Sequence, residues 1–228
     1  RGVSVHEASL VEEIVKDEQG LTCRYKEKGK DAVVTSEAVL IAVGRKANII
    51  NLYEDNIKLE IEKGLIKVND NYQTVYPNIY AVGDVIGGVQ LAHAAAAEGK
   101  NAVMHILGSE DRIDTKVIPS CIYTTPEIAS VGITSDDAKR QNIKVITKKF
   151  PMLANGKTVL SGMDRGYVKI IADENTHKVL GAQMMCGRAT DMISELTLAI
   201  VNELTLEDIK KVIHPHPTFS EAIKDALN

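Results

Sequence analysis

The sequence predicts an α/β (α+β) fold, and three observations support that prediction. Short apolar runs that end in a glycine and a charged residue occur twice, at residues 39–45 and 79–84. An alanine-rich segment, residues 91–108, favours a helix that ends at Gly108. After residue 117, segments with strand patterns and helix patterns alternate to the end of the chain.

Composition narrows the class of protein. The chain has 228 residues, of which 44% are hydrophobic, so a core can form without disulfides. A net charge of -4 favours neither nucleic acid nor an anionic membrane as a partner. No apolar run is long enough to cross a membrane, and the first residues do not resemble a signal peptide. We therefore expect a soluble protein of the cytoplasm or the mitochondrial matrix, with the cytoplasm favoured.

The three cysteines predict neither a disulfide framework nor a metal site. Cys23, Cys121 and Cys186 lie far apart, and no CxxC pair or His/Cys cluster occurs. We expect three ordinary thiols and no bound metal.

The first third of the chain is predicted to contain mainly strands. Residues 3–43 form short strands, with a polar hairpin tip at residues 26–31. An apolar strand is expected at Val39–Val43, ended by Gly44, and a further strand at residues 64–70. The run 79–82 is expected to be a buried strand as well.

The rest of the chain is predicted from local signals. Two strands flank a proline turn in residues 117–133, a strand covers 143–150, and a hairpin covers 166–187. Capping residues start the helices: Thr134 or Ser135 for 134–142, Thr190 for 189–204, a capping box of Thr205 and Asp208 for 205–213, and Thr218 or Ser220 for the last helix.

A ligand site is indicated where the run 79–82 ends. Gly83 permits close backbone approach, and Asp84 places a carboxylate where it can bind neighbouring hydroxyls of a polyol or ribose. The N-terminus of the next helix offers N–H groups to an anionic ring, beside the small residues 92–97. An ordinary strand-to-loop turn with a solvated Asp84 explains the same residues, and His93 fits a helix-start residue better than a catalyst.

The stretch "HPHPTFSEA", residues 214–222, indicates acid–base chemistry. Each proline disfavours helical geometry at the histidine before it, so the backbone is stiff and extended. Glu221 follows His216 closely enough for its carboxylate to bind one imidazole nitrogen and leave the other as a general base. A purely structural His–Glu pair is the alternative.

Together these stretches resemble the pyridine nucleotide–disulfide oxidoreductases. Five motifs occur in family order and span nearly the whole chain: residues 39–48, 78–99, 118–132, 166–185 and 214–223. The resemblance implies that residues 1–48 end an NAD-binding domain, that 49–117 are the returning part of an FAD-binding domain, and that 118–228 form the dimerisation domain.

The resemblance also implies roles for individual residues. His216 becomes the acid–base catalyst, oriented by Glu221, and the His216–Pro217 bond is expected to be cis. Asp84 binds the ribitol of FAD and Ala92 contacts the flavin through its backbone. The remaining cofactor-binding residues are expected to be Gly83, Leu91 and His93 near FAD, and Gly44 near NAD.

The implied activity is oxidation of protein-bound dihydrolipoamide, with electrons passing through a disulfide and FAD to NAD. The implied partners are a second copy of the chain, bound through residues 118–228, and a lipoyl-bearing acyltransferase of a 2-oxo acid dehydrogenase complex or the glycine cleavage system. Two alternatives stay open: a glutathione-type disulfide reductase and a non-catalytic dimerisation module.

The chain departs from the family pattern in what it lacks. No GxGxxG phosphate loop and no CxxxxC pair occur in it. We therefore expect the later part of a longer protein, which alone is inactive and binds no cofactor stably.

Overall fold

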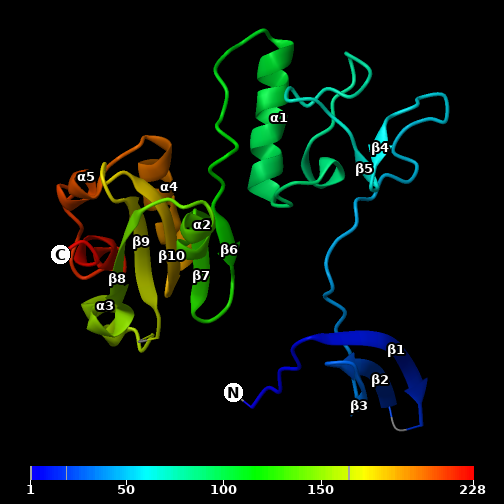
Figure 1. Ribbon diagram of the computed structural model, residues 1–228, viewed down its shortest axis with the longest axis horizontal. Helices are drawn as coiled ribbons and strands as arrows, with labels where there is room; N and C mark the ends of the chain where they lie inside the picture. The colour runs from blue at the N-terminus through cyan, green and yellow to red at the C-terminus, as the bar shows by residue number, and fades with distance from the viewer. Residues whose placement is uncertain (1, 19, 164) are drawn as a thin grey trace. The chain divides into compact units, whose positions relative to one another are not determined.

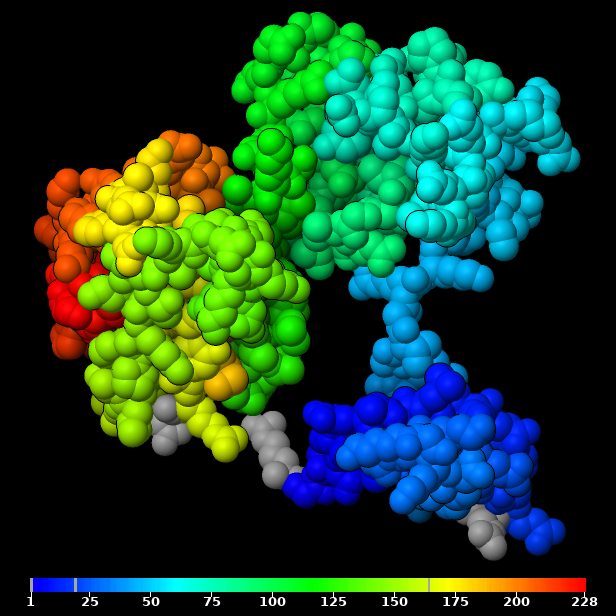
Figure 2. Space-filling view, viewed as in Figure 1, coloured from blue at the N-terminus to red at the C-terminus, as the bar shows by residue number. Residues whose placement is uncertain are grey.

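The computed structural model describes residues 2–18, 20–163 and 165–228. The chain divides into two compact units, Arg1–Lys46 and Ala47–Asn228. Figure 1 labels their helices and strands, and Figure 2 colours the first unit in shades of blue. Each unit is described separately.

The first unit is a three-stranded antiparallel sheet. β1 (Ser9–Asp17), β2 (Gly20–Glu27) and β3 (Lys30–Ser36) follow one another in the sheet in chain order. Lys28 and Gly29 both have positive φ, as the tight turn of a two-residue hairpin requires. The predicted polar hairpin is confirmed.

The predicted strand Val39–Val43 is wrong. These residues have no regular secondary structure, and Leu40 and Val43 are each 91% exposed. An apolar run becomes a strand only where another strand offers its N–H and C=O groups. Among the described residues, no strand pairs with Val39–Val43.

The first part of the second unit contains one long helix and little sheet. β4 (Ile61–Glu62) and β5 (Leu65–Ile66) form a small hairpin, so the strand expected at residues 64–70 is much shorter than predicted. α1 (Ala92–Ile106) confirms the predicted helix, and Gly108 follows it with a φ of 68°.

Residues 79–82 do not form the predicted buried strand. Tyr80 makes only an isolated bridge with Gln73, and a 3-10 helix, η1 (Gly83–Ile86), follows directly. The physical reason is again the lack of a neighbouring strand, because one isolated bridge pairs too few backbone N–H and C=O groups to extend a strand.

Residues 118–228 build on a five-stranded antiparallel sheet. Its order is β6-β7-β10-β9-β8, so the β9–β10 hairpin lies beside both β7 and β8 (Figure 1). The strands confirm the predicted strand and hairpin segments. Their bounds are β6 Ser120–Ile122, β7 Glu127–Gly132, β8 Val145–Pro151, β9 Tyr167–Asp173 and β10 Val179–Cys186.

Short helices surround this sheet. They are α2 (Ser135–Arg140), α3 (Gly156–Leu160), α4 (Ala189–Val201), α5 (Leu206–Lys210) and α6 (Glu221–Asp225), with a 3-10 turn, η2 (Met152–Ala154), before α3. Thr134 caps α2 and Thr205 caps α5, each in a capping box with an aspartate three residues later, so both predicted starts are confirmed. The sequence did not predict η2 or α3.

The predicted cap of α4 is wrong. Arg188 is the N-cap residue, in the left-handed region with a φ of 62°, and its side chain makes no cap hydrogen bond. Thr190 lies inside the helix, where its N–H and hydroxyl donate to Glu127 Oε2 over 3.0 and 2.7 Å. The carboxylate of Glu127 on β7 thus accepts a hydrogen bond from the first turn of α4, where a cap residue of the helix would otherwise provide the acceptor.

The core lies between the sheet and α4. Alternate residues of β10, namely Ala182, Met184 and Cys186, are fully or almost fully buried, as a strand with one covered face requires. Ile193 and Leu196 of α4 pack in the same cluster. No helix in the described part of the chain is both long and apolar enough to cross a membrane.

Candidate active-site motif and cofactor-binding residues

His216 and Glu221 form a pair at the start of α6. His216 Nδ1 lies 2.8 Å from Glu221 Oε1, and the Thr218 N–H donates to Glu221 Oε2 over 2.9 Å. The imidazole is 77% exposed, whereas the carboxylate is 20% exposed. Glu221 is therefore held on both oxygens, while the imidazole projects outward.

The local sequence explains this arrangement. Pro215 and Pro217 fix the backbone on either side of His216, and the His216–Pro217 bond is cis, as expected. The Thr218 hydroxyl donates to the Pro215 carbonyl over 2.7 Å and closes the turn. Ser220 is the N-cap residue of α6, so one of the two predicted cap positions is confirmed, but its side chain makes no cap hydrogen bond. The Glu221 carboxylate, in the first turn of α6, accepts from the Thr218 N–H before the helix.

Hydrogen bonding decides the charge of Glu221 and the tautomer of His216. The Thr218 N–H, followed by the His216 ring, lowers the pKa of Glu221 below its ordinary 4.5, so Glu221 is a carboxylate at neutral pH. A carboxylate only accepts hydrogen bonds, so Nδ1 of His216 must carry a proton. In the neutral imidazole, Nε2 is then the basic nitrogen, on the exposed side chain.

His214 has a different environment from His216. Its side chain is 4% exposed, and Nε2 lies 2.9 Å from Glu195 Oε1 on α4. Its Nδ1 lies 3.3 Å from the Val212 carbonyl oxygen. Both nitrogens are engaged inside the protein, so His214 anchors the motif and does not face a substrate.

The predicted FAD-contacting residues gather at η1 and the start of α1. Gly83 has a φ of 76°, and a Cβ there would lie 3.0 Å from Ala95 Cβ, so the position favours glycine. Its N–H donates to the buried Glu98 carboxylate over 2.7 Å. Asp84 is in the first turn of η1. The structure therefore packs the turn that carries Asp84 against α1.

The start of α1 is suited to an anionic group. Leu91 is its N-cap residue and provides no side-chain cap bond, so the first N–H groups have no side-chain acceptor from the cap position. Ala92 and His93 are the first two residues of α1. His93 Nε2 lies 2.7 Å from the Pro119 carbonyl oxygen. This contact holds His93 and fits the helix-start interpretation better than a catalytic one.

Gly44 belongs to the first unit, unlike the other predicted site residues. Its φ is 116°, and nothing lies within 4 Å of where a Cβ would be. The backbone there is open to close approach by another molecule.

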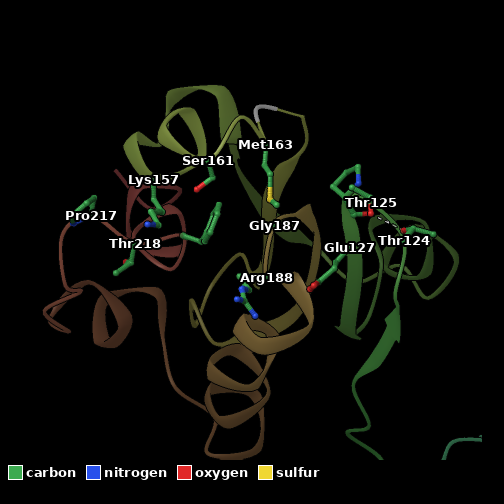
Figure 3. Close-up of a pocket in the computed structure, with 12 residues that line it drawn as sticks. Thr124, Thr125, Glu127, Lys157, Ser161, Met163, Gly187, Arg188, Pro217 and Thr218 are labelled. Carbon is green, nitrogen blue, oxygen red and sulfur yellow. Dashed lines mark hydrogen bonds between the residues drawn. The ribbon is translucent and has the colours of Figure 1, made fainter. Parts of the chain in front are cut away.

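A cavity of about 540 Å³ adjoins the HPHPT motif. Figure 3 shows Lys157 and Ser161 from the α3 segment, Arg188 from the start of α4, and Pro217 and Thr218 from the motif around it. The sequence did not predict this cavity, because its walls come from segments far apart in the chain. In the part of the chain that the structure describes, no group of three His, Cys, Asp or Glu side chains could hold a metal ion.

Comparisons with known proteins agree with this fold. Residues 118–227 match the pyridine nucleotide-disulphide oxidoreductase dimerisation domain, and residues 1–99 match the pyridine nucleotide-disulphide oxidoreductase domain. LpdA of Mycobacterium tuberculosis superposes with a TM-score of 0.89 at 24% identity, over 99% of this chain and 49% of that one. The flavoprotein disulfide reductase RclA of Escherichia coli gives 0.84 at 26% identity, over 96% and 50%. The chain belongs to the pyridine nucleotide-disulphide oxidoreductases, which confirms the resemblance and the fold class.

The similar curated proteins carry a more specific name. A dihydrolipoyl dehydrogenase of Bacillus subtilis is 42% identical over 95% of this chain and 46% of its own length. A mitochondrial dihydrolipoyl dehydrogenase of Arabidopsis thaliana is 39% identical over 90% of this chain and 41% of its own. The chain therefore spans about half the length of the relatives it matches.

Proposed function

We propose that the chain is part of a dihydrolipoyl dehydrogenase, which oxidises protein-bound dihydrolipoamide and passes the electrons through a disulfide and FAD to NAD. The observation that carries the proposal is the His216–Glu221 pair, with its 2.8 Å contact, in a segment that matches the dimerisation domain of this family. The relatives of this name support the choice of substrate.

In this proposal His216 carries the substrate proton. A thiol has a pKa of about 8.5, so little of it is thiolate at neutral pH. Nε2 of His216 accepts the proton as the thiol becomes a nucleophile, and it returns a proton in the reverse direction. Glu221 keeps Nδ1–H oriented and stabilises the imidazolium that forms.

We further propose that residues 1–48 belong to the NAD-binding domain, 49–117 to the FAD-binding domain and 118–228 to the dimerisation domain. The family uses FAD and NAD, and the groups at η1 and α1 fit a flavin: the Asp84 carboxylate can bind ribitol hydroxyls, and α1 presents N–H groups beside the small Ala92. Gly83, Leu91 and His93 adjoin this site, and Gly44 is the proposed contact to NAD. When bound, FAD would supply an electron acceptor and donor.

The proposed partners follow from the same assignment. Residues 118–228 bind a second copy of the chain, and the match to a dimerisation domain supports this. The substrate carrier is a lipoyl-bearing acyltransferase of a 2-oxo acid dehydrogenase complex or the glycine cleavage system. Relatives include bacterial and mitochondrial proteins, and we favour the cytoplasm over the mitochondrial matrix.

Substrate oxidation by the protein that the whole gene encodes tests the proposal. We expect NADH to form from dihydrolipoamide and NAD, with no reduction of glutathione disulfide by a reduced nicotinamide cofactor. Reduction of glutathione disulfide without oxidation of dihydrolipoamide would favour the glutathione-type reductase. If the protein dimerises but catalyses neither reaction, that result would favour a non-catalytic dimerisation module.

A further inference from the structure

Asn155 is a buried side chain whose bonds reach the HPHPT motif from a distant part of the chain. It is 2% exposed and is the N-cap residue of α3. Its Oδ1 accepts from the Thr158 N–H and the Thr158 hydroxyl, each over 2.9 Å. Its Nδ2 donates to the Thr218 carbonyl over 3.0 Å, across 63 residues of sequence. The two ends of one amide thus serve two different segments.

The position of Asn155 is fixed by the core. Its backbone N–H donates to the carbonyl of Met152 over 2.9 Å, and the Met152 side chain is fully buried. Met152 is also bound to the Gly166 carbonyl through its own N–H. Asn155 therefore gives Thr218 a rigid point of attachment, because a packed interior moves little.

Thr218 connects Asn155 to the His216–Glu221 pair through its backbone. Its carbonyl accepts from Asn155 and its N–H donates to Glu221 Oε2 over 2.9 Å, so the peptide groups on both sides of the residue are held. Glu221 in turn contacts His216 through Oε1 at 2.8 Å. A continuous series of hydrogen bonds joins the core at Met152 to the exposed imidazole.

From this geometry we infer that Asn155 is a positioning residue, whose Nδ2–H holds Thr218 so that Glu221 is correctly aimed at His216. The catalytic consequence rests on the proposed function, whereas the structural link does not. The competing explanation is that Asn155 only caps α3. The two roles use different atoms, Oδ1 for the cap and Nδ2 for the link, so substitutions can separate them.

Two variants make that separation. Asn155→Ser keeps an oxygen that can cap α3 but loses the Nδ2 donor to Thr218. Thr158→Ala is the matched control, because it removes a hydrogen bond to the same Asn155 Oδ1 and leaves the link to Thr218 intact. Both substitutions are uncharged and shorten a buried polar side chain of the same segment.

The first readout is the titration of the Glu221 carboxyl carbon by NMR in the 228-residue chain. The Thr218 N–H is the largest cause that lowers the pKa of Glu221. We expect Asn155→Ser to raise this pKa towards its ordinary value and Thr158→Ala to leave it where it is in the wild type. An unchanged pKa in Asn155→Ser, or an equal rise in both variants, would overturn the inference.

A measurement on the wild-type chain guards against variants that fold poorly. A through-hydrogen-bond NMR coupling between the Asn155 side-chain nitrogen and the Thr218 carbonyl carbon is expected. Absence of that coupling in the native chain would refute the link whatever the variants do.

The second readout is catalysis by the protein that the whole gene encodes. We expect Asn155→Ser to lower kcat roughly three- to tenfold, the effect of one ordinary hydrogen bond, and to move the acid limb of the pH profile with unchanged FAD content. Thr158→Ala should keep the wild-type profile. If the Glu221 titration responds but His216→Gln stays fully active, the proposed function fails and the link stands. If His216→Gln is inactive and Asn155→Ser behaves like wild type in both readouts, the positioning role fails alone.

Discussion

At the scale of single residues, Glu221 links the backbone to the imidazole. It accepts from the Thr218 N–H and lies 2.8 Å from His216 Nδ1, so removing it frees the ring to rotate. We expect Glu221→Ala to lower kcat about tenfold to hundredfold, less than loss of His216 itself, because Glu221 orients the base without carrying the substrate proton. Steady-state kinetics of the two variants check the order, and a larger loss in Glu221→Ala would contradict it.

The pKa of Glu221 gives a pH dependence with a definite sign. The folded protein lowers this pKa below 4.5, so the carboxylate contributes its stabilisation fully above that pH. The contribution is lost as the pH falls through the lowered pKa. The difference in unfolding free energy between wild type and Glu221→Gln should therefore be constant at neutral pH and shrink in acid. Denaturant unfolding at a series of pH values measures it, and a difference that grows in acid would refute this sign.

The cysteines are expected to differ in reactivity. Burial, followed by the nearby Glu127 charge, raises the pKa of the Cys186 thiol to about 12, and burial also raises that of Cys121. Since the thiolate is the reactive form, Cys186 should resist iodoacetamide in the native chain and react only after unfolding. Cys23 serves as the internal control. Labelling of Cys186 at the rate of Cys23, seen by peptide mass spectrometry, would contradict the described core.

At the scale of the helices, the start of α5 depends on a capping box that the local sequence predicts. The Asp208 N–H donates to the Thr205 hydroxyl, and the Asp208 carboxylate accepts from the Thr205 N–H. Thr205→Ala should lower the unfolding free energy by about 1 kcal/mol, whereas Thr205→Ser should preserve it, because serine caps equally well. If denaturant unfolding shows that Thr205→Ala is as stable as the wild type, the cap contributes nothing.

What the sequence could predict depended on how local each signal is. The β9–β10 hairpin, the start of α2 at Thr134 and the capping box of α5 depend on residues close together in the chain, and their prediction was correct. The strand at Val39–Val43 depends on a neighbouring strand, and the start of α4 depends on Glu127, 63 residues from Thr190. The His216–Glu221 contact spans five residues and could be anticipated. The Asn155–Thr218 bond could not, since nothing near Asn155 indicates its distant acceptor.

At the scale of the whole molecule, the 228-residue chain is expected to dimerise without a flavin. Residues 118–227 match a dimerisation domain, and Leu198 and Val201 on α4 expose apolar side chains. The chain contains no GxGxxG phosphate loop to hold the FAD pyrophosphate. Light scattering should give the mass of a dimer, and the absorption spectrum should lack a flavin band. A monomer, or a yellow chain, would contradict the corresponding half of this prediction.

The most direct test of the central claim is His216→Gln in the protein that the whole gene encodes. Glutamine keeps a polar side chain but cannot act as a base near neutral pH. We predict that bound FAD, measured by its absorption, is unchanged and that the rate of dihydrolipoamide oxidation falls by about 10²- to 10⁴-fold, the usual contribution of a general acid–base. Wild-type oxidation by this variant, or loss of its FAD together with its fold, would contradict the assignment of His216 as the acid–base residue.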